Sequence, residues 1–176
     1  MLTDGQIDIP HAMRKYHFLI ALLVVLLDQA TKWAVHNSIH LNYSIDVLPG
    51  FFRLTHVQNT GAAFGLFADS SSEWKVSILV VFSTLALVVV SALLWKNSHS
   101  ITSTGVGLSL ILGGAVGNLW DRLLTGHVID FFDFYVGSYH WPAFNIADSA
   151  IVVGALLLVA EILFAKSPAE QNVIRN

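Results

Sequence analysis

The chain has 176 residues, of which 55% are hydrophobic and only 12% are charged, and its mean hydropathy is +0.64. A soluble domain carries about 25% charged residues, so this composition indicates an integral membrane protein. The formal charge of -3, without a basic stretch, argues against nucleic-acid binding, and the lack of cysteine excludes thiol nucleophiles, thiolate metal sites and disulfides.

Four apolar segments are long enough to cross a bilayer, which takes about 20 helical residues. We therefore predict an all-α polytopic membrane protein, with one transmembrane domain at 16–165 between an N-terminal tail, 1–15, and a C-terminal tail, 166–176. An even number of spans places both tails on one side, and the lysines and arginines favour the cytoplasmic side for them. The predicted spans are residues 16–35, 76–95, 101–120 and 144–165.

Two longer connections lie on the predicted outer side. The first, 36–74, contains Ser44–Leu48, a Pro49-Gly50 turn and Phe51–Val57, which predicts a short hairpin or small sheet near the membrane surface. We interpret 121–143 as a second loop, whose aromatic side chains suit the lipid–water interface.

Polar residues near the predicted helix ends are the candidates for a site. Asp28 and Lys32 are four residues apart and share a helix face, so they form either a neutralised pair or a contact with substrate. The segment 59–65, Asn-Thr-Gly-Ala-Ala-Phe-Gly, is either a plain turn or a loop that hydrogen-bonds an extended peptide.

The third span ends in a glycine-rich segment with three polar residues. Gly113 and Gly117 have the spacing of a close helix contact. Packing alone does not account for Asn118, Asp121 and Arg122, which we expect to shape a site, with Arg122 binding a carbonyl or phosphate or pairing with Asp121.

Two acids stand in positions that are unfavourable for acids. Asp130 is enclosed by aliphatic and aromatic residues, and Asp148 lies at the start of the fourth apolar run, three residues after Asn145. Asp148 has an ordinary interpretation as a helix-capping acid, and Asp133 competes with Asp130 as the functional acid. If Asp130 and Asp148 meet, one proton shared between them equips the pair for hydrolysis.

Other chemistries find little support in the chain. There is no GxSxG or HExxH motif, and Ser149 has no evident base beside it. The spacing of His127, Asp130, Asp133 and His140 fits no compact metal motif. We expect neither a metal nor another cofactor.

Taken together, five segments resemble one family, the bacterial lipoprotein signal peptidases, also called signal peptidase II. They follow the family's order and cover residues from about 16 to 165. The matching segments are Asp28–Lys32, Asn59–Phe64, Gly113–Arg122, Gly126–Phe131 and Phe144–Ala150.

The resemblance implies an aspartic endopeptidase of the bacterial inner membrane with a four-helix fold, a small periplasmic β-sheet and an active site at the outer face. Such enzymes cut prolipoproteins on the N-terminal side of a cysteine that carries diacylglyceryl, and globomycin inhibits them. By resemblance, membrane lipid and the lipid-modified prolipoprotein are the partners, and Asp130 and Asp148 are the catalytic dyad. The residues that match the substrate and inhibitor site are Asp28, Lys32, Asn59, Gly61, Asn118, Arg122 and Asn145.

Two alternatives use the same polar residues differently. A small proton- or ion-coupled transporter would also place carboxylates, a lysine and an arginine in the membrane, although the chain has no evident internal repeat. A membrane scaffold without enzymatic activity would use the acids only as helix caps.

Overall fold

The computed structural model describes residues 9–61, 74–97 and 101–164. The predicted tails and Ala62–Phe64 of the second motif therefore lie wholly or mostly outside the described residues. In chain order, the described elements are α1 (Ile9–Ser38), β1 (Ser44–Leu48), β2 (Phe52–Asn59), α2 (Trp74–Asn97), α3 (Ser103–Thr125), β3 (Val128–Val136), β4 (Tyr139–His140) and α4 (Ile146–Phe164).

Each predicted span coincides with a helix. Within the described residues, three helices are long and apolar enough to cross a membrane, in the ranges 15–38, 77–97 and 146–164 of α1, α2 and α4. Large apolar side chains of these helices, such as Leu22, Phe82 and Leu156, are more than half exposed, as is typical of surfaces that face lipid. The fourth predicted span falls in α3, which is richer in glycine and is not in this group, so its membrane crossing stays a prediction.

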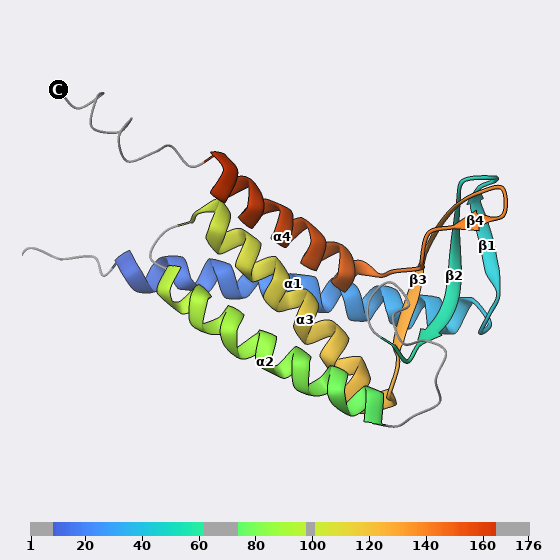
Figure 1. The fold of residues 1–176 in the computed structure, drawn as a ribbon, viewed down its shortest axis with the longest axis horizontal. Helices are drawn as coiled ribbons and strands as arrows, with labels where there is room; N and C mark the ends of the chain where they lie inside the picture. The colour runs from blue at the N-terminus through green and yellow to red at the C-terminus, as the bar shows by residue number, and fades with distance from the viewer. Residues whose placement is uncertain (1–8, 62–73, 98–100, 165–176) are drawn as a thin grey trace, which may run out of the picture.

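Helix α3 lies at the centre of the bundle and packs against each of the other three helices (Figure 1). Its glycines allow this close approach. A Cβ atom at Gly113 would lie 2.6 Å from the carbonyl oxygen of Ala21, and one at Gly117 would lie 2.6 Å from Asp28 Oδ2. The predicted role of this glycine pair in helix packing is confirmed, and Gly117 also leaves room for a buried carboxylate.

The four strands form one small antiparallel sheet in the order β1-β2-β3-β4. The predicted hairpin is confirmed as β1 and β2. The interpretation of 121–143 as a loop is wrong, because Val128–Val136 forms β3 and pairs with β2. This strand was missed because apolar residues flank its acids on both sides, so the alternation typical of a half-buried strand is absent.

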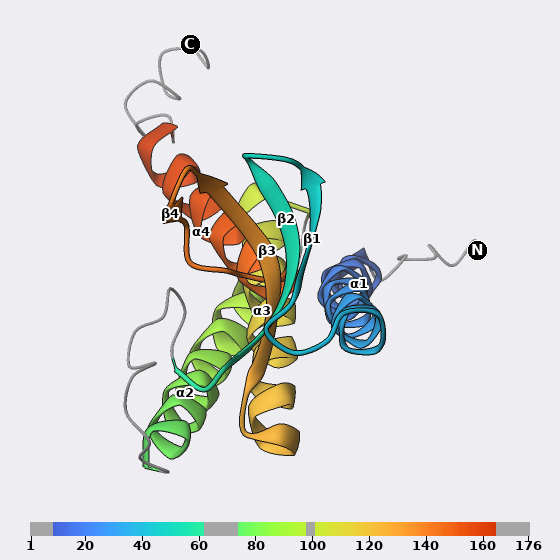
Figure 2. The ribbon, with the colours of Figure 1, turned by 90° about the vertical axis from the view of Figure 1, so that its right-hand side faces the viewer.

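The sheet stands at one end of the bundle, where α1 and α3 end and α4 begins (Figures 1 and 2). The first turns of α1 and the last turns of α4 lie at the opposite end (Figure 1). A buried cluster of Val35, Ile39 and Phe131 joins the end of α1 to β3. This junction of helix ends and sheet brings the polar motifs together.

Candidate active site

Asp130 and Asp148 lie close enough for their charges to interact, because the segment before α4 is bound to β3. The backbone N–H groups of Phe131 and Phe132 both donate to the carbonyl oxygen of Phe144, at 3.0 and 2.8 Å, and Phe144 N–H donates back to Phe132 at 3.2 Å. Asp130 precedes the first of these residues by one position, and Asp148 lies in the first turn of α4. A contact between segments far apart in the sequence thus places the two carboxyl groups in one site.

Asn145 contacts both acids. Its side-chain Nδ2 donates to Asp130 Oδ1 at 2.7 Å, while its Oδ1 accepts from the backbone N–H of Asp148 at 2.9 Å. The side chain of Asn145 is fully buried, at 0% exposure. A buried amide that is bonded on both sides has a fixed orientation, so it holds the two acids at a fixed relation to each other.

Asp130 is an acid in an environment that disfavours its charge. Its side chain is 2% exposed, and burial is the main reason that its pKa rises to about 7. Repulsion from Asp148 raises the pKa further, while hydrogen bonds from Asn59 and Asn145 and the charge of Lys32 act in the opposite direction. Asp130 therefore binds a proton at a pH where an ordinary aspartic acid has lost it.

Asp148 is less enclosed and has the contacts of a helix-capping residue as well. Its Oδ2 accepts from the backbone N–H of Asn145 at 3.4 Å, which completes a reciprocal capping box at the start of α4. Its Oδ1 accepts from Asn118 Nδ2 at 2.7 Å. Both contacts and the helix N-terminus favour a negative charge on Asp148. The capping interpretation and a functional one are thus compatible.

Lys32 is the centre of a buried polar cluster behind Asp148. Its ammonium donates to Asp28 Oδ2 at 2.7 Å, to Asp121 Oδ2 at 2.6 Å and to Asn118 Oδ1 at 3.0 Å. Asp28 Oδ1 in turn accepts from the backbone N–H of Ala147. The predicted pair of Asp28 and Lys32 is therefore present, and it links α1 to the start of α4.

The predicted site residues Asn59 and Arg122 both bind Gly61. Asn59, at the end of β2, donates through Nδ2 to Asp130 Oδ2 at 2.8 Å and accepts from the backbone N–H of Gly61 at 2.8 Å. Arg122 donates to the carbonyl oxygens of Gly61, at 3.1 Å, and Asn118, at 3.3 Å. Asp121 pairs with Lys32, so the alternative in which it pairs with Arg122 is not observed, and the role of Arg122 toward a substrate stays a prediction.

Asp133, the acid that competes with Asp130, makes other contacts. Asp133 pairs with Arg53 Nε at 2.6 Å and with His140 Nδ1 at 2.9 Å, on the sheet and away from Asn145. Among the described residues, no group of three or more histidine and acidic side chains has an arrangement that could hold a metal ion.

Sequence reasoning did not single out Gln29 and did not predict that Asp121 pairs with Lys32. Gln29 Nε2 donates to Asp121 Oδ1 at 2.8 Å and lies 3.4 Å from Asp28 Oδ2. The position of Gln29 directly after Asp28 was the only hint in the sequence that Gln29 belongs to the cluster. However, adjacent helix residues do not face each other, so only the packing of α3 against α1 explains the contact.

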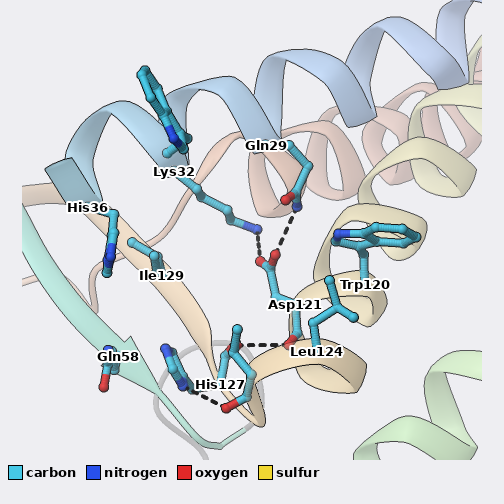
Figure 3. A pocket seen from close by; sticks show the side chains of 11 residues that line it. Gln29, Lys32, His36, Gln58, Trp120, Asp121, Leu124, His127 and Ile129 are labelled. Atoms are coloured by element: carbon cyan, nitrogen blue, oxygen red, sulfur yellow. Dashed lines mark hydrogen bonds and ion pairs between the residues drawn. The ribbon is translucent and has the colours of Figure 1, made fainter.

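Two hollows flank this polar centre. One of about 340 Å³ contains Asp148 in its wall, together with Ser149 and the apolar side chains Trp141, Phe144, Val152 and Val153. The other, of about 300 Å³, lies between α1, the end of α3 and the adjacent ends of β2 and β3, and neither acid of the dyad lines it (Figure 3). Of these two hollows between described residues, the first has Asp148 in its wall.

The sequence of the chain is similar to known proteins over most of its length. The family model described as signal peptidase (SPase) II matches residues 20–164. Proteins named lipoprotein signal peptidase are 46% identical to the chain in Solibacter usitatus and 45% identical in Desulforapulum autotrophicum, each over 150 residues. These alignments cover 85% of this chain and 92% and 93% of the relatives.

Solved structures agree with these matches. A bacterial membrane enzyme determined by the in meso method at 2.3 Å superimposes with a TM-score of 0.75 at 33% identity, covering 85% of this chain and 88% of that one. A second such structure, at 1.9 Å, gives a TM-score of 0.74 at 33% identity and covers 86% and 95% of the two chains. By sequence and by fold, the chain therefore belongs to the signal peptidase II family and is a membrane protease of lipoprotein processing.

Proposed function

We propose that the protein is an aspartic endopeptidase that removes the signal peptide from diacylglyceryl-modified prolipoproteins, cutting on the N-terminal side of the lipidated cysteine. Asp130 and Asp148 are the catalytic residues. Asn145 supports this assignment most directly, because its side chain binds the carboxyl group of Asp130 at 2.7 Å and the backbone N–H of Asp148 at 2.9 Å.

The surroundings of the two acids suggest a division of labour. Asp130, with its raised pKa, carries the shared proton and donates it in a hydrogen bond to the oxygen of the scissile carbonyl. Asp148 is ionised and takes a proton from the attacking water, whose oxygen bonds to the carbonyl carbon. The proton on Asp148 then moves to the leaving nitrogen as the C–N bond breaks, which returns the pair to its singly protonated state.

The hollow beside Asp148 suits an apolar substrate. Its walls are mainly apolar side chains of α4 and of the segment before it, so a signal peptide can reach the carboxyl group from the lipid. A peptide cut in this position must be unwound, and its free N–H and C=O groups need partners. Asn59, Gly61 and Arg122 are the nearest candidates, while Asp28, Lys32, Asn118 and Asn145 are buried and support the dyad from behind.

The protein would lie in the bacterial inner membrane with α1 to α4 as its four spans and with the sheet and dyad at the periplasmic face. Lys15 and Lys96 lie near the helix ends away from the sheet. At the sheet end, Lys32 and Arg53 are paired with acids, and Arg122 lies near Asp121, Asp130 and Asp148. Because unpaired positive charge favours the cytoplasm, this distribution supports cytoplasmic termini.

Incubation of the purified protein with a lipid-modified pre-lipoprotein tests the function. We expect a size shift of the substrate that globomycin prevents and that requires the lipid on the cysteine. A transporter or a scaffold would produce no size shift with or without globomycin, and that result would refute the peptidase proposal.

The dependence of cleavage on pH follows from the proton on Asp130. A group that must be protonated is active below its pKa, so kcat/KM should fall as the pH rises through about 7. A series of initial rates between pH 5 and 9 measures this limit in the free enzyme. A kcat/KM that rises through this range would show that Asp130 acts in its ionised form.

Filling the hollow beside Asp148 should weaken substrate binding. Val153→Trp places a large ring in this hollow, so we expect kcat/KM to fall roughly tenfold, mainly through a higher KM. Val159→Trp is a matched control, because Val153 and Val159 are both on α4 and both 49% exposed, but Val159 lies outside the hollow. Equal kinetic effects of the two substitutions would contradict this placement of the substrate.

A further inference from the structure

The ammonium group of Lys32 determines the orientation of a neighbouring amide. An ammonium can only donate hydrogen bonds, and that of Lys32 has its three protons directed at Asp28, Asp121 and Asn118. Asn118 must therefore present its oxygen to Lys32. Its NH2 group is then directed away from Lys32, where Nδ2 donates to Asp148 Oδ1 at 2.7 Å.

This orientation matters for the dyad. The NH2 group of Asn118 stabilises the ionised form of Asp148, the form that activates water in the proposed reaction. If the amide turned over, its oxygen would face the carboxylate of Asp148 and repel it. The position of Lys32 therefore affects Asp148 through the side chain of Asn118.

Two residues that are not among the predicted catalytic or substrate-site residues hold Lys32 in this position. Asp121, from the last turns of α3, binds Lys32 at 2.6 Å. Gln29, one turn before Lys32 on α1, binds the other oxygen of Asp121 at 2.8 Å. Figure 3 shows both Gln29 and Lys32 directed toward Asp121 from the same helix. Because its two oxygens are bound separately, the carboxylate of Asp121 has a fixed orientation.

Gln29 and Asp121 do not line the hollow that contains Asp148, where we place the substrate. Gln29 and Asp121 line the hollow of about 300 Å³ between α1 and α3, and the described residues that line the Asp148 hollow do not include them. Hydrogen bonds to Lys32, and from Lys32 to Asn118, connect Gln29 and Asp121 to Asp148, and the charge of Asp121 also acts on the two acids through space.

We propose that Asp121 and Gln29 are positioning residues for the cleavage reaction, which hold Lys32 so that Asn118 keeps its NH2 group on Asp148. This inference rests on the proposed peptidase function and assigns a role to two side chains that do not contact the substrate.

Steady-state kinetics of Asp121→Asn and Gln29→Leu, together with their thermal unfolding, test the proposal. For folded protein, we expect kcat to fall roughly 10- to 100-fold while KM stays within about twofold, because the geometry of the dyad is disturbed and substrate contacts are not. Leu124→Ala is the matched control, since Leu124 lines the same hollow and is exposed. It should leave kcat unchanged.

The pH profile of Asp121→Asn is a second readout, because a loss of folded protein would lower the rate without moving the pH limit. The charged groups near the dyad are Asp28, Lys32, Asp121 and Arg122. Asp121→Asn removes one negative charge from this set, so Asp130 should lose its proton more readily and the alkaline limit of kcat/KM should move to lower pH. Asp121→Glu retains the charge and should keep the limit of the wild type, as should Gln29→Leu.

Two results would overturn the proposal. One is wild-type kcat in folded Asp121→Asn and Gln29→Leu, together with an unmoved pH limit in Asp121→Asn. The other is a raised KM with unchanged kcat, which would indicate substrate contact. If Asp121→Asn does not fold, the kcat of Gln29→Leu decides. Failure of the wild type to cleave the lipidated substrate would instead refute the peptidase function itself.

Discussion

Asp130→Asn and Asp148→Asn should each abolish cleavage while the protein stays folded. An asparagine has the size of aspartic acid and keeps a carbonyl oxygen for the hydrogen bonds from Asn145 and Asn118, but it can neither carry the shared proton nor accept one from water. Loss of a positioned acid or base costs about 10²- to 10⁴-fold in rate. The size shift of a lipidated pre-lipoprotein measures the effect, and thermal unfolding in detergent verifies the fold.

Asp133→Asn is the matched control for these variants. Asp133 lies in β3 like Asp130 and is similarly buried, at 5% against 2% exposure, but it pairs with Arg53 and His140. We expect this change to lower stability and to leave the rate per folded molecule close to that of the wild type. Near-normal turnover by Asp130→Asn or Asp148→Asn would show that the dyad assignment is wrong.

Lys32→Met should cause the largest loss of stability among single substitutions in the polar cluster. Lys32 is 3% exposed and neutralises Asp28, which is 0% exposed, as well as Asp121. Methionine fills most of the space of the lysine stem but leaves two carboxylates without their counter-ion. Removing one partner of a buried ion pair costs about 3–5 kcal/mol, so we expect a lower free energy of unfolding by about this amount.

Two further variants make this stability measurement specific. Lys15→Met removes a lysine from the exposed surface of the same helix, where it lies over the ring of Tyr16, and should change the free energy of unfolding by no more than about 0.5 kcal/mol. Adding Asp28→Asn to Lys32→Met removes one of the uncompensated charges and should recover part of the loss. Equal stability of Lys32→Met and Lys15→Met would contradict a stabilising role of the cluster.

The sequence alone determined the helices and the class of protein. The predicted spans 16–35, 76–95, 101–120 and 144–165 each lie mostly within one helix, with boundaries that differ by one to seven residues. This agreement has a local cause, because a run of about 20 apolar residues has to form a helix in lipid whatever the rest of the chain does. The β1–β2 hairpin was predictable for a similar reason, since its Pro49-Gly50 turn is encoded in adjacent residues.

The order of five short motifs also pointed to the family from sequence alone, and the match over residues 20–164 agrees with it. Resemblance named Asp130 and Asp148 as functional residues, but composition and spacing could not show that they meet. Their roles in the reaction stay predictions until the variants are measured.

Only the tertiary structure decided which polar groups meet. β3 was missed because its stability depends on pairing with β2 and with Phe144, residues far from it along the chain. Asp121 stands next to Arg122 in sequence but pairs with Lys32, because the glycines of α3 let this helix approach α1 closely. A hydrophobic pattern is set by residues that are neighbours in the sequence, so it can be recognised without the fold. A buried polar group instead bonds to the partner that tertiary packing brings within about 3 Å. The dyad and the cluster behind it are therefore products of the fold.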